Sequence, residues 1–116
     1  MALNVEQQSF RTIADVLEDV KQKGLWPTTF VSGPSKGASV HWHEYDVHAY
    51  IMEGETDFLD AEQNVRHPVA AGDKIIIEAR TLHAEGPVED KVVYLIAVPT
   101  ALAPDDFLAT RDPAEL

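Results

Sequence analysis

Residues 40–54 read VHWHEYDVHAYIMEG and hold three of the five histidines of the chain. His41 and His43 are two residues apart, so in a β-strand both side chains leave the same face and can converge on one ion. Trp42 would then face the opposite side. On its own, this spacing is more typical of two solvated histidines on an edge strand. Together with Gly54, Gly72, Asp73 and His83, it predicts a metal site on a sheet, with His83 opposite the pair.

Composition limits what such a site can be. The 116 residues are enough for one domain with its own core. The chain has no cysteine, which excludes disulfides and zinc-thiolate sites, so a metal must be bound by imidazole and oxygen. The formal charge is −11 and the nine basic residues are scattered, which argues against nucleic acid or an anionic membrane as a partner. With no signal-like or membrane-spanning apolar run, we expect a cytoplasmic protein.

The N-terminal region shows a helical pattern. Between Asn4 and Lys23, apolar residues recur at steps of three and four, the period of a helix with one apolar face. Asn4 followed by Gln7 resembles a capping box, and Gly24 stands where a C-terminal cap belongs. We therefore predict an N-terminal amphipathic helix within residues 1–24.

After residue 24 the pattern changes to short β-rich runs separated by turn residues. Strands are expected at residues 25–31, 38–43, 47–53, 56–60, 65–69, 74–78, 82–84 and 91–98. This predicts an all-β barrel or sandwich over residues 25–100, followed by a tail, residues 101–116, with a short helix at 105–109. The runs 74–78 and 91–98 are apolar on both faces, so we expect one face to be covered by the core and the other by the helix or another subunit, which favours a homodimer.

Two segments resemble the motifs of the cupin family, whose members are small jelly-roll β-barrels. The first family motif has a glycine, His-x-His, a glutamate and a closing glycine; the second opens with Gly-Asp and ends with a single histidine. The matching positions are Ser35 or Gly37, His41, His43 and Gly54 for the first motif, and Gly72, Asp73 and His83 for the second. The resemblance implies a cupin-type jelly-roll barrel that binds one divalent transition metal ion, which could be iron, nickel, zinc, copper or manganese.

The glutamate of the first motif has no counterpart here. Its position falls on Val47 or His48, depending on the direction of counting. In a regular strand Val47, Ala49 and Ile51 face inward and form an apolar pocket with Val40, while His48 faces out. A β-bulge would instead turn His48 inward and make it a fourth ligand.

The expected ligands are therefore His41, His43 and His83, with His48 as a candidate fourth. Glu85 is interpreted as an ordinary charged residue of a turn or edge. Without a carboxylate ligand, a divalent ion would keep its full charge and favour an anionic, bidentate oxygen ligand.

The resemblance and this ligand set predict a mononuclear metal-binding protein. The leading hypothesis is a dioxygenase-type oxidoreductase that acts on a small oxygen-chelating substrate. A non-catalytic metal-dependent binding or sensing module and a metal-dependent isomerase or lyase remain as alternatives. No catalytic acid or base is assigned.

Overall fold

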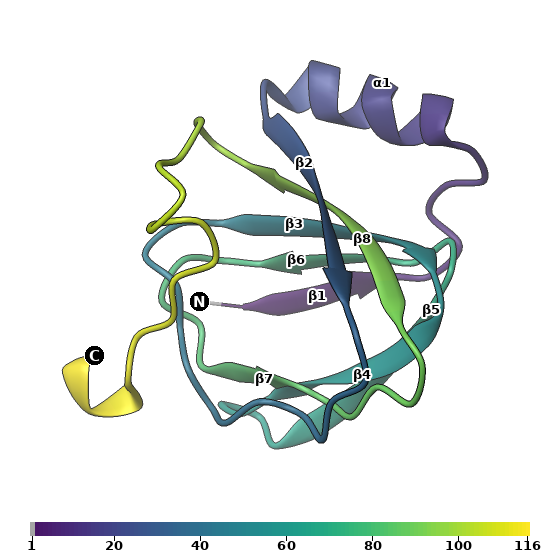
Figure 1. Cartoon of the computed structure of the whole chain (residues 1–116). Coiled ribbons are helices and arrows are strands. Elements are labelled where there is room, and N and C mark those ends of the chain that lie inside the picture. Colours follow the sequence, from purple (N-terminus) through teal and green to yellow (C-terminus); the bar gives the residue numbers. More distant parts are fainter. Residues whose placement is uncertain (1) are drawn as a thin grey trace.

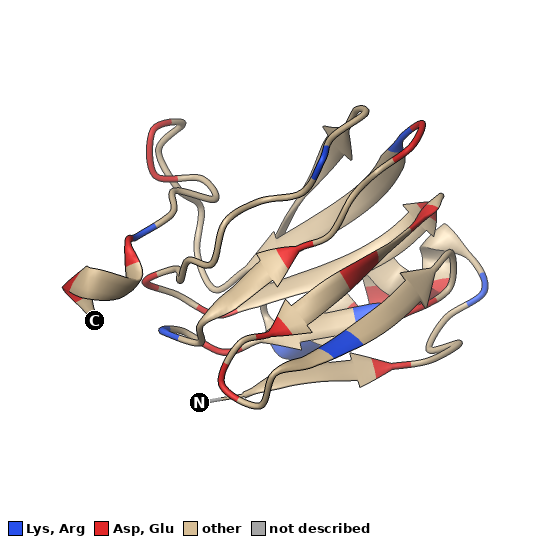
Figure 2. Cartoon of the chain, turned by 90° about the horizontal axis from the view of Figure 1, so that it is seen from below, with Lys and Arg blue, Asp and Glu red and all other residues tan. Residues whose placement is uncertain are grey.

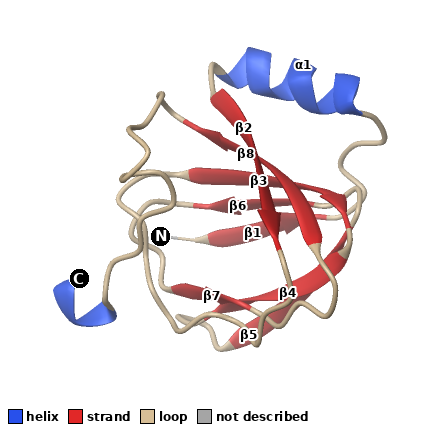
Figure 3. Ribbon diagram, in the orientation of Figure 1, coloured by secondary structure: helices blue, strands red, loops and turns tan. Residues whose placement is uncertain are grey.

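Two antiparallel sheets face each other in the computed structural model, which describes residues 2–116, and one helix lies across the outside of the larger sheet (Figures 1 and 3). The elements are β1 (Leu3–Glu6), α1 (Ile13–Lys23), β2 (Trp26–Ser32), β3 (Val47–Glu53), β4 (Glu55–Asp60), β5 (Val65–Ala70), β6 (Lys74–Ile77), β7 (His83–Glu85), β8 (Val92–Val98) and the 3-10 turn η1 (Pro113–Glu115). The larger sheet has the order β1-β6-β3-β8-β2 and the smaller one β5-β4-β7. The predicted all-β jelly-roll architecture is confirmed.

The core fills the space between the two sheets. Alternate residues of each strand face it, as the period of a strand requires. Its buried members are Leu3, Val47, Ala49, Ile51, Phe58, Val69, Ile75, Ile77, Val88, Val92, Tyr94, Ile96 and Val98. Both sheets therefore bury one face against the other, and the helix covers part of the remaining face of the larger sheet.

The predicted N-terminal helix begins later than expected. Residues 3–6 form the edge strand β1, in which Leu3 and Val5 pair with β6 and face the core. The capping box expected from Asn4 and Gln7 is therefore wrong. Residues 3–6 are too few to show the two-residue alternation of a strand in the sequence. They form a strand because they pair with β6.

The helix itself is bounded by specific caps. The Thr12 hydroxyl accepts a hydrogen bond from the Asp15 backbone N–H, and the Asp15 carboxylate accepts one from the Thr12 N–H. Gly24 ends the helix in the left-handed conformation, as predicted. Val16 and Val20, one turn apart, are buried against the outer face of β3 and β8.

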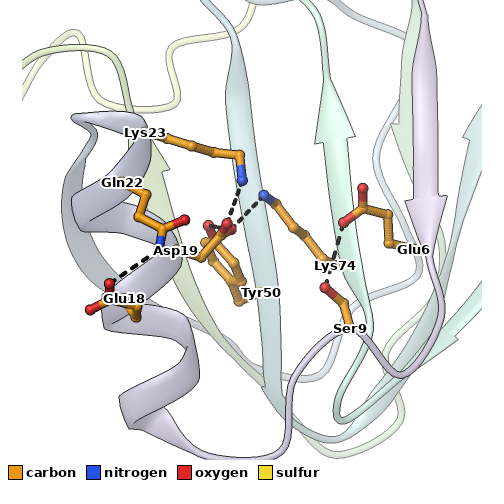
Figure 4. Close-up of polar contacts among 8 residues, drawn as sticks. All are labelled: Glu6, Ser9, Glu18, Asp19, Gln22, Lys23, Tyr50 and Lys74. Carbon is orange, nitrogen blue, oxygen red and sulfur yellow. Dashed lines mark hydrogen bonds and ion pairs between the residues drawn. The ribbon is translucent and has the colours of Figure 1, made fainter.

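A polar cluster fastens the helix to the sheet (Figure 4). The Asp19 carboxylate accepts hydrogen bonds from Lys74 Nζ at 2.8 Å and from the Tyr50 hydroxyl at 2.6 Å, and it pairs with Lys23. The Lys74 side chain is only 1% exposed, so its charge is balanced by Asp19 and not by solvent. Burial would raise the pKa of Asp19, but the bonds from Lys23, Lys74 and Tyr50 outweigh it and lower the pKa below its ordinary value of 3.8.

Replacing Asp19 with asparagine should lower the free energy of unfolding by about 2 kcal/mol at neutral pH, because it leaves the buried Lys74 ammonium without a counter-charge. A carboxylate with a lowered pKa stabilises the fold above its unfolded-state pKa and loses that contribution as the pH falls. The difference between Asp19→Asn and the wild type should therefore shrink below about pH 4. Urea unfolding at pH 7 and pH 3 measures both values. Glu18→Gln, an exposed change on the same helix, is the control, and an equal loss in both variants would contradict this role of Asp19.

Two glycines of the motifs have a positive φ, a backbone conformation that favours glycine. Gly54 has φ 92°, and a Cβ there would collide with the Lys91 carbonyl oxygen. Gly72 has φ 98°, and the following Asp73 is buried, with its carboxylate accepting the backbone N–H of Gln8 and of Ala70 at 2.9 Å. The Gly-Asp pair thus joins the β5–β6 turn to the end of β1.

Two further segments differ from the predicted secondary structure. Residues 38–43 are not a continuous strand; His41 bridges to β7 on one side and Trp42 bridges to Arg111 on the other. Residues 105–109 form turns rather than a helix, and Leu108 at φ 54° interrupts helical geometry there.

The acidic residues are spread over strands and loops, as the view from below shows (Figure 2). This agrees with a formal charge of −11. None of the described helices has the length and apolar character needed to cross a membrane.

Candidate metal site

Two short segments place four potential ligands on one face. His41 and His83 form an antiparallel bridge through reciprocal backbone hydrogen bonds of 2.9 and 3.0 Å. Directly opposite residues in such a pair point to the same side. His43 and Glu85 each follow two residues later, so they share this face. Each of the two segments therefore carries a pair of potential ligands two residues apart.

The four side chains converge on a small volume. One ligand atom from each of His41, His43, His83 and Glu85 lies within 4.8 Å of all the others. His41 Nε2 lies 3.3 Å from one Glu85 oxygen, and His83 Nε2 lies 3.8 Å from the other. The three histidines are buried and Glu85 is partly exposed.

Backbone carbonyls orient all three rings. Each Nδ1 lies within hydrogen-bond distance of one carbonyl oxygen and can only donate to it, so each Nε2 is left unprotonated in the neutral ring. The pairs are His41 with Ser39 at 2.7 Å, His43 with Ala109 at 3.0 Å, and His83 with Thr81 at 2.8 Å. This outer support is what metal-binding histidines need.

The residues present fit a metal ion. Among residues 2–116, four side-chain atoms are buried without a hydrogen-bond partner: His48 Nδ1 on the outer face of β3, and three at this site, His41 Nε2, His83 Nε2 and Glu85 Oε2. Buried polar atoms are rarely left unpaired, so these three atoms favour an ion between them. Three imidazole nitrogens and one carboxylate suit iron, nickel, copper, zinc or manganese.

The proton equilibria of the site also favour an ion at neutral pH. Burial raises the pKa of Glu85, but the neighbouring His41 and His83 outweigh it and lower that pKa to about 2. Burial lowers the pKa of His83 to about 4 and also lowers that of His43. Burial opposes the charged form of His41 too, but the Glu85 carboxylate outweighs this and raises the pKa of His41. His41 is thus the ligand on which a proton competes most with a metal.

A cavity of about 280 Å³ opens beside these ligands. His41, His43 and Glu85 lie in its wall, which is otherwise mostly apolar. Its other lining residues are Phe30, Ser32, Ser35, Gly37, Ala38, Val47, Ala49, Phe58, Ile77, Gly86, Val88, Tyr94, Ile96, Leu108 and Thr110. Of the four predicted pocket residues, Val47 and Ala49 line this cavity. Ile51 is instead fully buried in the core, and Val40 lies outside the lining.

His48 is not part of this group. The pairing of β3 is regular from Val47 to Ile51, and its irregularity comes later, between Ile51 and Glu53. The side chain of His48 therefore leaves the face opposite Val47, and the structure does not support it as a fourth ligand. On that outer face, burial first and then the charge of Lys74 lower the pKa of His48.

Glu85 is the residue that the sequence analysis missed, and its interpretation as an ordinary charged residue is wrong. Glu85 lies two residues after His83, just as His43 lies two residues after His41, and this repeated spacing could have identified it. The carboxylate thus comes from the second motif instead of the first. It would cancel one unit of an ion's charge, so a divalent ion would not keep its full charge.

Comparisons with known proteins find similarity in structure alone. Neither a protein-family profile nor a curated protein matches the chain. A DUF861 family protein from Thermotoga maritima has a TM-score of 0.60 at 14% identity, over 84% of this chain and 99% of that one. A cupin-2 domain containing protein from Shewanella frigidimarina has 0.55 at 15%, over 66% and 72%. The DMSP lyase DddQ from Ruegeria pomeroyi has 0.56 at 18%, over 72% and 45%.

Proposed function

We propose that this chain, which has the cupin fold, is a mononuclear metal-dependent oxidoreductase of the dioxygenase type that acts on a small substrate chelating through two oxygens. The observation that carries the proposal is the convergence of His41, His43, His83 and Glu85, three of which, all but His83, lie in the wall of a mostly apolar cavity. A bound iron or copper ion would hold the substrate oxygens and supply redox chemistry with O2.

The charges of the cavity wall favour one kind of substrate. Within the described part of the chain, Glu85 is the one charged side chain of this lining, and no lysine or arginine contributes to it. A phosphate or carboxylate remote from the ion would therefore be buried without a cationic partner. The expected ligand has a single anionic chelating end, as in an enolate or catecholate, and an apolar body that contacts Val47, Ile77 and Ile96.

The protein groups around the substrate have distinct roles in this proposal. The backbone carbonyls hold the three imidazoles with Nε2 toward the ion, and the apolar wall excludes water. Tyr94 lines the cavity, and burial, with a contribution from the Glu85 charge, raises its pKa. Its phenol thus stays protonated at neutral pH and can donate a hydrogen bond to the ligand.

A metal-dependent isomerase or lyase that does not use O2 is the second candidate. It is favoured by the protonated phenol of Tyr94, which could return a proton to a substrate carbon. It is also favoured by the reaction types named for two structural neighbours. These are the polyketide cyclase RemF from Streptomyces resistomycificus and a putative mannose-6-phosphate isomerase from Ralstonia eutropha. A non-catalytic binding module would share the same ligand preference.

Oxygen uptake separates these functions. Protein loaded with Fe²⁺ under anaerobic conditions is mixed with β-diketones, catechols or flavonols and then exposed to O2, with Zn²⁺-loaded protein as the control. The proposal expects substrate-dependent O2 uptake with iron alone, and tighter binding of catechol than of 3,4-dihydroxybenzoate, which carries a remote carboxylate. Product formation without O2 uptake would favour the isomerase or lyase, and ligand binding without any product would favour the binding module.

A further inference from the structure

The segment 103–112, here called the C-terminal strap, lies against the metal site (Figure 1, yellow-green to yellow). The Ala109 carbonyl oxygen accepts the hydrogen bond from His43 Nδ1 at 3.0 Å. Leu108 and Thr110 form part of the cavity wall, and Leu108 also packs on the core between the sheets. The strap thus supplies both a support for one ligand and a surface for the substrate.

Side chains that follow His41 fasten the strap. The Tyr45 hydroxyl donates to the Asp106 carbonyl at 2.8 Å and accepts from the Leu108 N–H at 2.6 Å. Trp42 Nε1 donates to the Asp112 carbonyl at 3.0 Å. The segment that carries His41 and His43 therefore holds the strap in place through the side chains of Trp42 and Tyr45.

Leu108 has an unusual backbone conformation. Its φ of 54° lies in the left-handed region, which non-glycine residues rarely adopt. Such a conformation costs free energy and persists only where surrounding contacts impose it. Here the Tyr45 hydroxyl binds the Leu108 N–H, and the side chain is directed into the cavity wall and the core. The conformation thus coincides with contacts at the site.

We propose that the C-terminal strap is part of the metal site and has two roles. The Ala109 carbonyl is a positioning group that fixes the tautomer and orientation of His43, and Leu108 is a specificity-determining residue that limits the bulk of the substrate's apolar body. The proposal rests on the metal-dependent function proposed above, because both roles concern that site.

The first role is tested with Tyr45→Phe, which removes the hydroxyl that fastens the strap. The variant keeps the aromatic ring that stacks on His43, with ring centroids 6.1 Å apart. The dissociation constant for Zn²⁺ should rise about tenfold, as is typical when outer support of a ligand is lost. Nitrogen-15 NMR of the metal-free protein at alkaline pH should show that His43 no longer holds its proton on Nδ1 alone. Tyr50→Phe is the control, because it weakens the helix attachment and should leave both readouts unchanged.

A Zn²⁺ affinity within twofold of the wild type, together with an unchanged His43 tautomer, would overturn this role. The NMR signal does not require a metal. If the wild type bound no metal, the proposed function would fail, while the tautomer would still report whether the strap positions His43.

The second role is tested with Leu108→Ala. The affinity ratio of 4-tert-butylcatechol to catechol should rise roughly tenfold in the metal-loaded variant, because space is opened in the wall. Leu102→Ala is the matched control: Leu102 packs on the same core but lies outside the cavity lining. An unchanged ratio in Leu108→Ala, or an equal change in both variants, would overturn the assignment of Leu108.

Discussion

The His83→Ala protein is expected to contain almost no bound metal under conditions in which the wild type binds one ion per chain. His83 is fully buried, and its Nε2 lies 3.8 Å from a Glu85 oxygen and has no hydrogen-bond partner among the described residues. Losing an outer support of a ligand typically weakens metal binding by 10- to 100-fold, so losing the ligand itself should cost at least about 100-fold. Elemental analysis after dialysis, and competition with a chromogenic chelator, measure this loss.

His48→Ala is the matched control, since it removes a partly buried histidine from the opposite face of β3. Its metal content should equal that of the wild type. Because His83→Ala opens a small void, circular dichroism and thermal unfolding of the metal-free proteins must show that both variants fold. A folded His83→Ala protein that keeps one ion per chain would contradict the ligand assignment.

Glu85→Gln should have the second-largest effect on the metal. The change keeps the shape of the side chain but removes the one negative charge among the four converging groups, so affinity for a divalent ion should fall about 100-fold. Isothermal titration with Zn²⁺ or Mn²⁺ measures the change. Glu78→Gln, an exposed change just after β6, is the control and should bind metal as the wild type does.

The same variant should change the pH dependence of metal binding. In the wild type, Glu85 raises the pKa of His41, so a proton competes with the ion for His41 as the pH falls toward and below that pKa. Without the carboxylate, burial is opposed only by the weaker effect of the Ser39 carbonyl, so it lowers the pKa of His41. The acid loss of affinity should therefore begin at lower pH in Glu85→Gln. An identical pH profile would show that Glu85 does not act on His41.

Most of the strands could be predicted because their signals are local. The alternation of residues 47–53 and the apolar runs around 74–78 and 91–98 coincide with β3, β6 and β8. Strand β1 was missed because its four residues carry too little pattern, and its conformation depends on pairing with a strand some 70 residues later. Local propensity cannot reveal such a partner.

The three histidines could be predicted because their spacing matches known motifs, whereas Glu85 required tertiary information. An isolated glutamate near a strand end is usually an exposed charge. Its proximity to His41 results from the bridge between His41 and His83, which the sequence does not display. The same reason explains why the tail was not expected at the site: the contact of Ala109 with His43 joins residues 66 positions apart.

The homodimer remains a prediction. Its best structural support is the edge strand β2, which pairs with β8 and exposes Trp26, Phe30 and Val31. Unpaired, apolar edge strands tend to be covered by another chain. The cytoplasmic location likewise stays a prediction.

The most direct test of the account is the metal content per chain of untagged wild-type protein, measured by elemental analysis after reconstitution with each candidate ion and removal of excess. We predict close to one tightly bound transition-metal ion per chain, held by His41, His43, His83 and Glu85. A correctly folded protein that retains no ion under any of these conditions would contradict the metal site and the oxidoreductase function derived from it.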